Sequence, residues 1–261
     1  MKPISELTVK IFGDGADLAG IRALSQKPFI KGFTTNPTLM RKAGVRDYQE
    51  FALQVLQLIP DRPVSFEVLA DDADTMESQA RHIATWGPNV YVKIPVTNTR
   101  REPMYPLVRR LSQDGIQINV TALLTLEQVR DATKALRGGA PSNVSIFAGR
   151  IADTGRDPVP VMTEAVAILR DNPQSELIWA SPRELLNIYH ADQCGCHIIT
   201  VTNDILQKLH LIAKDLNDYS LETVKMFYDD GVKSGYAVRP AKLVEDLPDA
   251  GSIAVKKRAS S

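Results

Sequence analysis

One lysine stands in a run of otherwise apolar residues, where its amine could act as a nucleophile. Lys93 lies in the middle of segment 90–96, whose composition predicts a strand buried on both faces. Because burial penalises the charged form of an amine, the neutral and nucleophilic form is favoured there. Such an amine attacks carbonyl groups, so Lys93 indicates Schiff-base chemistry. A structural role is the alternative, with the amine reaching the rim of the sheet or pairing with a carboxylate.

Two carboxylates occupy positions where they could transfer protons. Asp14 follows an apolar run and stands between Gly13 and Gly15, so it could act as a general base at a strand end. Asp-Gly is also a common turn pair, and a turn is the alternative. Glu67 lies inside the apolar segment 64–68, where a carboxylate needs a partner. It belongs either to a reacting group or to a structural ion pair, with Lys93 as a candidate partner.

Small polar residues and arginines supply possible binding groups. Segment 34–38 reads Thr-Thr-Asn-Pro-Thr, a strand-to-helix turn whose side chains could bind a ligand or simply cap the helix. Arg150, Ser181 and Arg183 could hold an anion at a helix N-terminus, where N–H groups and the helix dipole favour phosphate. Solvated surface charge is the alternative for each arginine.

Four potential zinc ligands lie close together, namely His190, Cys194, Cys196 and His197. Their Cys-x-Cys spacing is tight for a structural zinc site, and the sequence holds no second cysteine pair. We therefore predict no metal. The two cysteines are also too close for an ordinary disulfide, which is typical of a reduced intracellular protein.

Eight short β-rich segments could position these groups. They are residues 9–12, 29–33, 64–68, 90–94, 116–120, 144–147, 177–180 and 197–201. Segments with helical periodicity alternate with them: 17–25, 47–58, 75–86, 104–114, 126–136, 159–172, 182–191 and 203–214. This alternation predicts a parallel sheet, and eight units favour a single-domain (β/α)8 TIM barrel over an open doubly wound sheet. A ninth helix is expected at 221–234.

In such a barrel the carboxyl ends of the strands form one mouth. The polar residues at those ends would therefore converge. Those residues are Asp14, Thr34, Thr35, Asn36, Glu67, Lys93, Asn119, Thr121, Ser145, Arg150, Ser181, Arg183, Thr200, Thr202 and Asn203.

Length and charge narrow the classes of function. A chain of 261 residues is typical of one barrel, and we expect a catalytic domain over 1–238 with a C-terminal tail over 239–261. Lys+Arg and Asp+Glu are both 31, which argues against binding to nucleic acid or an anionic membrane. We find neither a signal-peptide pattern nor a spanning apolar run, and expect a cytoplasmic protein.

Six motifs now combine into one family resemblance. They are Gly32-Phe33-Thr34-Thr35-Asn36-Pro37-Thr38, Ser65-Phe66-Glu67-Val68, Val92-Lys93-Ile94-Pro95-Val96-Thr97, Ile118-Asn119-Val120-Thr121, Ser145-Ile146-Phe147-Ala148-Gly149-Arg150-Ile151 and Ala180-Ser181-Pro182-Arg183. In this order and spacing the chain resembles the transaldolase family, including its short, fructose-6-phosphate aldolase-like members.

The resemblance implies roles at the centre of the site. Lys93 is the implied Schiff-base lysine and Asp14 the implied acid/base. Glu67 and Thr121 are the pair that would position a catalytic water, while Asn119 would shape the environment of the lysine. No cofactor is implied.

It also implies the substrate contacts. Asn36, beside Thr35, and Ser145 would hold the bound three-carbon unit, and Arg150, Ser181 and Arg183 would clamp the phosphate. The implied reaction moves a dihydroxyacetone unit from a ketose phosphate, of the sedoheptulose 7-phosphate or fructose 6-phosphate type, to an aldose phosphate. Sugar phosphates are the expected partners. Because proteins of this family assemble as homo-oligomers, a homo-oligomer is also expected here.

Two residues bear on the choice between a transaldolase and an aldolase that releases free dihydroxyacetone. Glu67 and Phe147 stand where the family's transaldolases carry Glu and Phe, and its aldolases Gln and Tyr. Glycines around Asp14, Pro182 in place of Phe, and the unusual loop 98–103 leave room for an atypical sugar. A sugar-phosphate-binding barrel without turnover is the remote alternative.

Overall fold

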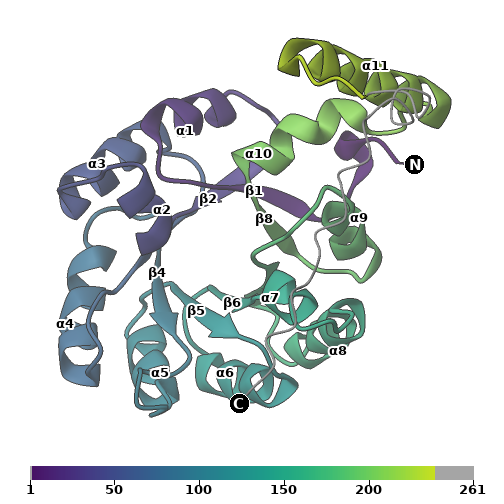
Figure 1. The fold of residues 1–261 in the computed structure, drawn as a ribbon. Helices are drawn as coiled ribbons and strands as arrows, with labels where there is room; N and C mark the ends of the chain where they lie inside the picture. Colours follow the sequence, from purple (N-terminus) through teal and green to yellow (C-terminus); the bar gives the residue numbers. More distant parts are fainter. Residues whose placement is uncertain (1, 239–261) are drawn as a thin grey trace, which may run out of the picture. The chain divides into compact units, whose positions relative to one another are not determined.

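The computed structural model describes residues 2–238. Within them, eight parallel strands close into a barrel in sequence order, because β1 pairs with both β2 and β8 (Figure 1). The strands are β1 (Lys10–Asp14), β2 (Ile30–Thr34), β3 (Val64–Glu67), β4 (Val90–Pro95), β5 (Ile118–Leu123), β6 (Ser142–Ile146), β7 (Ser175–Trp179) and β8 (Ile198–Thr202). The predicted (β/α)8 barrel is confirmed, with strand ends that differ from the prediction by a few residues.

Helices surround the strands as the alternation predicted, except that the helix expected over 203–214 is α-helical only to Leu206 and continues as a 3-10 turn to Leu211. They are α1 (Leu18–Ser25), α2 (Pro37–Lys42), α3 (Tyr48–Leu58), α4 (Ala73–Ala84), α5 (Tyr105–Gln113), α6 (Leu126–Leu136), α7 (Ala148–Ala152), α8 (Val159–Leu169), α9 (Leu186–Gln193) and α10 (Asn203–Leu206), with short 3-10 turns at Ile4–Glu6 and Gln207–Leu211. Helix α6 has the predicted bounds and begins with a capping box built from Thr125 and Gln128.

Three local predictions need correction. The short helices α2 and α7 were missed, because six and five residues are too few for a periodic signal. The helix expected from residue 182 begins at Leu186, so the expectation that Ser181 and Arg183 lie at the N-terminus of this helix is wrong. Ser181 instead has a left-handed backbone with φ 61°, which a helix N-cap does not adopt.

The inner face of the barrel changes from apolar to polar along the strands. Phe12 and Ile198 pack with Ile178 and Ala180 in a small cluster separate from the main core. The ring of Phe12 fills the space over Gly32, where a Cβ would come within 2.5 Å of it. Because side chains alternate along a strand, residues two positions further face the same interior. The inner residues at the carboxyl ends of the strands are polar, so a polar cavity can form there.

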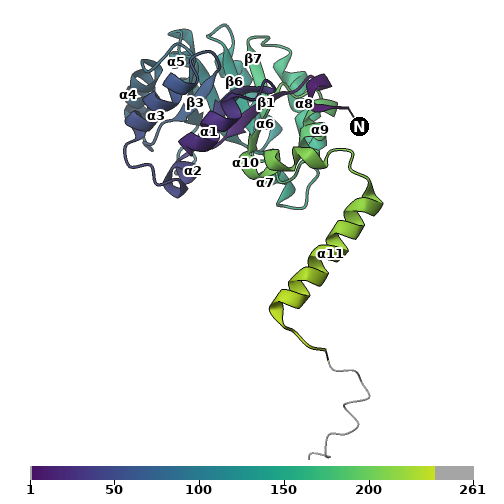
Figure 2. The same ribbon diagram turned by 90° about the horizontal axis from the view of Figure 1, so that it is seen from above.

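A second compact unit begins at residue 213. Its helix α11 (Leu216–Ser234) is one continuous element (Figure 2), capped by Asp215 and ended by Gly235 in a left-handed conformation, φ 65°. The helix predicted over 221–234 is confirmed and starts earlier. The predicted tail, 239–261, lies outside the described residues. Among residues 2–238, none of the helices has the length and apolar character needed to cross a membrane.

Candidate active site

A cavity of about 740 Å³ opens at the carboxyl ends of the strands. The predicted site residues line it except for Thr35, Thr202 and Asn203, and the last two line a neighbouring pocket instead. Thr35 is buried, and its hydroxyl donates to the Ser65 carbonyl at 3.0 Å. Its contribution to the site is therefore its main-chain carbonyl, a role that a sequence motif cannot reveal.

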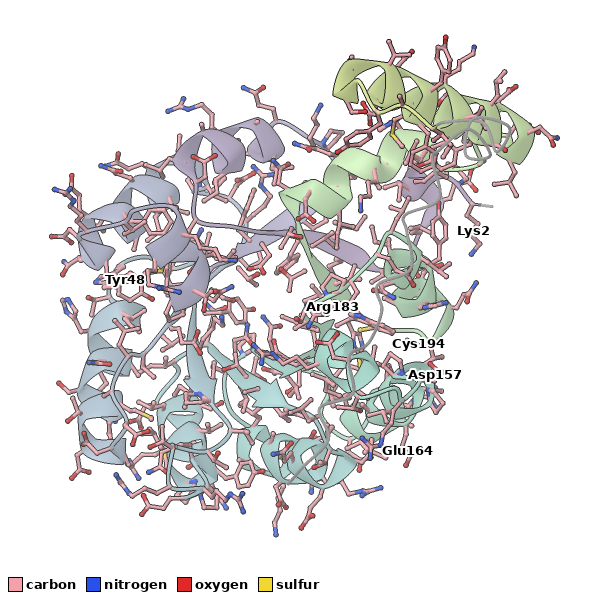
Figure 3. All side chains as sticks on the ribbon, in the orientation of Figure 1. Lys2, Tyr48, Asp157, Glu164, Arg183 and Cys194 are labelled. Carbon is pink, nitrogen blue, oxygen red and sulfur yellow. The ribbon has the colours of Figure 1, made fainter. Side chains whose placement is uncertain are left out.

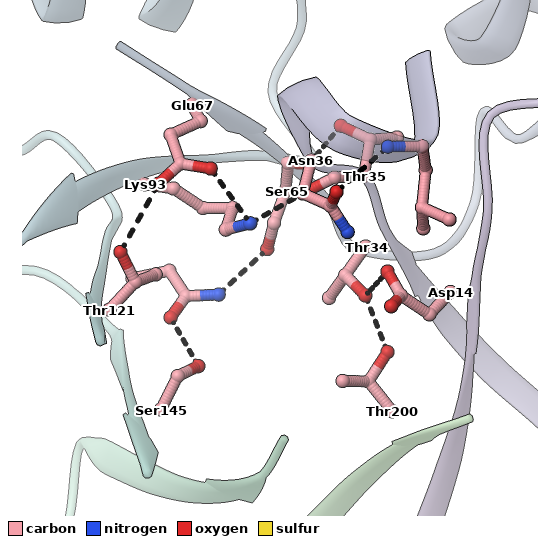
Figure 4. A network of polar contacts seen from close by, with 12 residues as sticks. Asp14, Thr34, Thr35, Asn36, Ser65, Glu67, Lys93, Thr121, Ser145 and Thr200 are labelled. Carbon is pink, nitrogen blue, oxygen red and sulfur yellow. Dashed lines mark hydrogen bonds and ion pairs between the residues drawn. The ribbon is translucent and has the colours of Figure 1, made fainter. Parts of the chain in front are cut away.

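Lys93 and Glu67 form the centre of the cavity. They are register partners on β4 and β3, and Lys93 Nζ lies 3.2 Å from Glu67 Oε2 (Figure 4). The Lys93 amine also donates to the Thr35 carbonyl at 2.7 Å, and only 7% of the Lys93 surface is exposed to solvent. The hydroxyl of Thr121 donates to the second Glu67 oxygen, Oε1, at 3.4 Å. The Glu67 carboxylate thus bridges the Lys93 amine and the Thr121 hydroxyl. The ion pair with Lys93 that the sequence suggested is therefore present, as part of a three-residue hydrogen-bonded group.

A second chain of hydrogen bonds runs beside the amine. Ser145 Oγ donates to Asn119 Oδ1 at 2.7 Å, and Asn119 Nδ2 donates to Ser65 Oγ at 3.1 Å. All three side chains are buried. These bonds hold the Asn119 amide in one orientation next to its register partner Lys93. Ser65 was not among the predicted site residues, although its position two residues before Glu67 on one strand was a usable signal.

Asp14 faces the cavity from the last position of β1. Burial raises the pKa of its carboxyl, and the nearby Lys93 charge and the Thr34 hydrogen bond oppose that rise. Thr34 Oγ1 donates to Asp14 Oδ1 at 2.8 Å, and the Thr34 and Thr200 hydroxyls contact each other. Asp14 is therefore a strand-end residue rather than a turn residue, and its carboxyl can take up a proton more readily than an exposed one.

Asn36 caps a helix and also lines the cavity. Its Oδ1 accepts the Leu39 N–H at 2.9 Å, which makes it the N-cap of α2, with Pro37 at the first helical position. The same side chain lines the cavity. Because the helix uses the oxygen, the amide nitrogen is the group that can donate toward a ligand.

Arg150, Ser181 and Arg183 gather on the β6–β7 side of the cavity. The Arg150 guanidinium lies 5.6 Å from the centre of the Phe147 ring. Arg183 donates to Ser181 Oγ at 3.2 Å through Nη1 and to Asp153 Oδ1 at 2.9 Å through Nε. The arginine holds the pKa of Asp153 below its usual range. Sequence reasoning missed Asp153, since nothing local to it indicates a partner thirty residues away.

Gly149 brings these two strand ends together. A Cβ at this position would lie 1.5 Å from the Ser181 carbonyl oxygen, and the Gly149 N–H points to the Ala180 carbonyl at 3.4 Å. No side chain fits in that gap. The close approach sets Arg150, the next residue, beside Ser181.

The His–Cys cluster is occupied by backbone contacts. The Cys196 thiol contacts the Leu177 and Ile198 carbonyls at 3.3 and 3.2 Å, and His197 Nδ1 accepts the Leu177 N–H at 3.0 Å. Burial raises the pKa of the Cys196 thiol. Over residues 2–238 we find no group of three or more side chains suited to a metal.

Comparison with known proteins shows to which protein family the chain is similar. The family model described as Transaldolase/Fructose-6-phosphate aldolase matches residues 11–238. A probable transaldolase of Streptococcus agalactiae serotype V is 38% identical over 229 residues, covering 85% of this chain and 98% of that protein. Probable transaldolases of Dehalococcoides mccartyi and Thermoanaerobacter sp. are 36% and 34% identical, covering 77% and 88% of this chain and 90% and 100% of those proteins.

Solved structures confirm the architecture alone. A putative lyase/mutase from Burkholderia cenocepacia superposes with a TM-score of 0.55 at 13% identity, covering 95% of this chain and 94% of that one. Dihydrodipicolinate synthase from Rhodopseudomonas palustris gives 0.53 at 12% identity, covering 89% and 82%. At such identities the likeness concerns the barrel and not its chemistry.

Proposed function

We propose that this chain, which belongs to the transaldolase/fructose-6-phosphate aldolase family, acts as a transaldolase through a Schiff base on Lys93. The observation that carries the proposal is the contact of the buried Lys93 with the partly buried Glu67, whose other oxygen accepts from Thr121. A buried lysine amine beside a carboxylate can pass its proton on and attack a carbonyl.

The first half-reaction builds and cleaves the adduct. Lys93 Nζ adds to C2 of a ketose phosphate to give a carbinolamine. Glu67 and Thr121 hold a water that shuttles protons while the carbinolamine loses water and becomes an iminium ion. Asp14 removes the C4 hydroxyl proton, the C3–C4 bond breaks, and its electrons pass to the iminium nitrogen. An aldose phosphate leaves, and a dihydroxyacetone enamine stays on Lys93.

The raised pKa of Asp14 suits its part. A carboxylate whose pKa is raised accepts the C4 proton more readily than an exposed aspartate, and it can return that proton in the second half-reaction, when C3 of the enamine attacks the acceptor aldehyde. Hydrolysis of the new iminium then frees the product and restores the Lys93 amine.

The remaining side chains hold the substrate. Ser145 and Asn36 are suited to the hydroxyls of the three-carbon unit, since both reach the cavity as small hydrogen-bonding groups. Arg150, Ser181 and Arg183 form the phosphate side. Two arginines and a hydroxyl supply the charge-assisted donors that phosphate oxygens accept.

Phe147 favours transfer over hydrolysis. It lies in the cavity under the Arg150 guanidinium and carries no hydroxyl to bring water to the enamine. An aldolase that releases free dihydroxyacetone is the second candidate, separated by whether dihydroxyacetone accumulates without an acceptor. The loop 98–103 is tied to Asp71 through Thr99 and contributes no side chain to the cavity.

Borohydride trapping tests the proposal. Fructose 6-phosphate with borohydride should leave a reduced three-carbon adduct on Lys93, located by peptide mass spectrometry. Lys93→Met should abolish the adduct, while Lys42→Met, at a lysine lining the same cavity, should leave it on Lys93. An adduct on no lysine with any ketose phosphate would overturn the proposal in favour of a barrel that binds sugar phosphates without turnover.

We further propose that the protein is a cytoplasmic homo-oligomer. Helix α11 exposes large apolar side chains, with Phe227 66% and Tyr228 72% exposed, and such surfaces are typical of contact sites. Light scattering at micromolar concentration tests the oligomeric state, and a monomer would contradict it. Cell fractionation of the full chain tests the compartment. The same measurement on a chain that ends at residue 238 tests whether the proposed tail affects it.

A further inference from the structure

A tyrosine hydroxyl outside the ring of strands holds the backbone of Glu67. Tyr48 is the first residue of α3, and its side chain lies between α3 and α4 (Figure 3). The Glu67 N–H donates to Tyr48 Oη at 2.7 Å, and Tyr48 Oη donates to the Glu67 carbonyl at 2.9 Å. One side chain thus satisfies both polar main-chain groups on one edge of the last residue of β3.

Strand β2 would normally fill this position. Along this edge the Phe33 N–H donates to the Pro63 carbonyl at 2.9 Å, and the Thr35 N–H to the Ser65 carbonyl at 3.2 Å. Bonds in a parallel ladder alternate evenly between strands. The next would join the Glu67 N–H to the carbonyl of residue 35, and the N–H of residue 37 to the Glu67 carbonyl.

Neither of those bonds is made, and each has a chemical reason. Residue 37 is proline, which has no N–H to donate. The Thr35 carbonyl accepts from Lys93 Nζ instead, at 2.7 Å. The ladder continues only on the other edge of β3, where the Val68 N–H donates to the Lys93 carbonyl at 3.1 Å. The strand end that carries Glu67 is therefore completed by Tyr48.

The tyrosine is itself fixed by packing. Its ring makes edge contacts with Phe66 and Trp86, with ring centres 6.4 and 5.5 Å away. Burial raises the pKa of Tyr48, so the hydroxyl keeps its proton and can donate and accept at once. Its position thus depends on the aromatic cluster and not on the substrate.

We propose that Tyr48 is a positioning residue for the reaction: its hydroxyl replaces the missing end of β2, and so holds the Glu67 carboxylate between Lys93 and Thr121 while the Thr35 carbonyl remains free for the Lys93 amine. This inference rests on the proposed function of Glu67. Tyr48 does not line the cavity, so it acts through Glu67 and not on the substrate.

Tyr48→Phe tests the inference, because it removes the hydroxyl and keeps the ring in its aromatic cluster. We expect kcat with fructose 6-phosphate and an aldose acceptor to fall about tenfold, with KM changed less than about twofold, as for the loss of buried hydrogen bonds that act on the reaction alone. Tyr189→Phe is the matched control. Its hydroxyl donates to the Lys2 carbonyl at 3.0 Å, away from the cavity, and kcat should stay near wild type.

A double-mutant cycle separates positioning from general damage. In a Glu67→Ala background, Tyr48→Phe should cost less than about twofold in kcat, since the side chain that it positions is gone. An equal loss in both backgrounds would overturn the inference. So would a loss in Tyr48→Phe that lies in KM alone.

A measurement without substrate keeps this test apart from that of the proposed function. In the ligand-free protein, hydrogen exchange of the Glu67 amide should accelerate at least about tenfold in Tyr48→Phe, with amides of β6 unchanged. Unchanged exchange at Glu67 would contradict the role of Tyr48 alone. Failure of wild-type trapping on Lys93 would contradict the proposed function alone.

Discussion

Lys93 Nζ and Glu67 Oε2 lie 3.2 Å apart at paired positions of neighbouring parallel strands. Strand pairing brings the two residues together although 26 positions separate them in the chain. The amine has a second acceptor in the Thr35 carbonyl, and the carboxylate a second donor in Thr121. Each group therefore keeps one hydrogen-bond partner when a proton passes from the amine to the carboxylate, which suits the proposed Schiff-base mechanism.

Replacing Glu67 by glutamine should slow formation of the Schiff base. The amide keeps the shape but cannot accept a proton, and Phe147 offers no hydroxyl of the kind that accompanies Gln in the family's aldolases, so carbinolamine dehydration loses its base. We expect kcat to fall about 10²-fold or more, the usual range for one acid–base group. Rapid-quench borohydride trapping measures the rate directly. A trapping rate equal to wild type would show that Glu67 only balances the charge of Lys93.

Asp14→Asn should remove carbon–carbon cleavage while leaving Schiff-base formation. Because the pKa of Asp14 is raised by burial, the acid limb of kcat/KM in the wild type should lie above the pH at which an exposed aspartate titrates. The variant should form a trapped adduct with the intact six-carbon ketose, since C3–C4 cleavage needs the base. A three-carbon adduct formed at the wild-type rate would remove Asp14 from the mechanism.

The same substitution should stabilise the fold at neutral pH. The folded-state pKa of Asp14 is higher than its unfolded value. Its contribution to stability is therefore fully present below the unfolded pKa and is lost as pH rises through the folded pKa. At pH 7 the buried charge opposes folding, so Asp14→Asn should raise Tm by about 2–4 °C, and the gain should shrink toward pH 4. Calorimetry at both pH values measures the difference.

Arg183→Met should weaken binding of the phosphate and little else. We expect KM for fructose 6-phosphate to rise about tenfold or more, as for the loss of a charge-assisted contact, with no change toward unphosphorylated fructose or dihydroxyacetone. Arg130→Met is the control, since Arg130 forms only an exposed pair with Glu164 at 3.7 Å. Equal losses with both sugars would place Arg183 outside the phosphate site.

Gly149→Ala should disrupt the phosphate side through packing alone. The new methyl would lie 1.5 Å from the Ser181 carbonyl, so the β6–α7 and β7–α9 connections must separate, at a cost of about 1–3 kcal/mol. Tm should fall and KM for fructose 6-phosphate should rise together. Gly231→Ala, where a Cβ meets nothing within 4 Å, should be neutral or slightly stabilising in α11.

Phe147→Tyr should shift the product ratio toward free dihydroxyacetone. The added hydroxyl would enter the cavity beside Arg150, where it can hold a water near the enamine. The ratio of released to transferred dihydroxyacetone, measured with and without an aldose acceptor, should rise. A ratio equal to wild type would mean that Phe147 does not control the choice between transfer and hydrolysis.

Local patterns in the sequence determined the strands, most of the helices and the side chains that line the cavity. The short apolar run 90–94 lies within β4, and Thr125 caps α6 through Gln128, three positions away. Since strands of one parallel barrel all end at the same mouth, the polar strand ends were bound to meet. Lys93 was recognisable because a lysine in an apolar run costs free energy to bury, so its presence there indicates a partner or a function.

Only the tertiary structure decided how those side chains are held. The Tyr48 hydroxyl on Glu67, Asp153 on Arg183, and Ser65 on Asn119 join residues 19, 30 and 54 positions apart. Such contacts depend on strand register, on the chain leaving the sheet after Thr35, and on the close approach at Gly149. Periodicity records which face of an element a residue occupies, but not which distant residue lies opposite, because that is set by closure of the whole barrel.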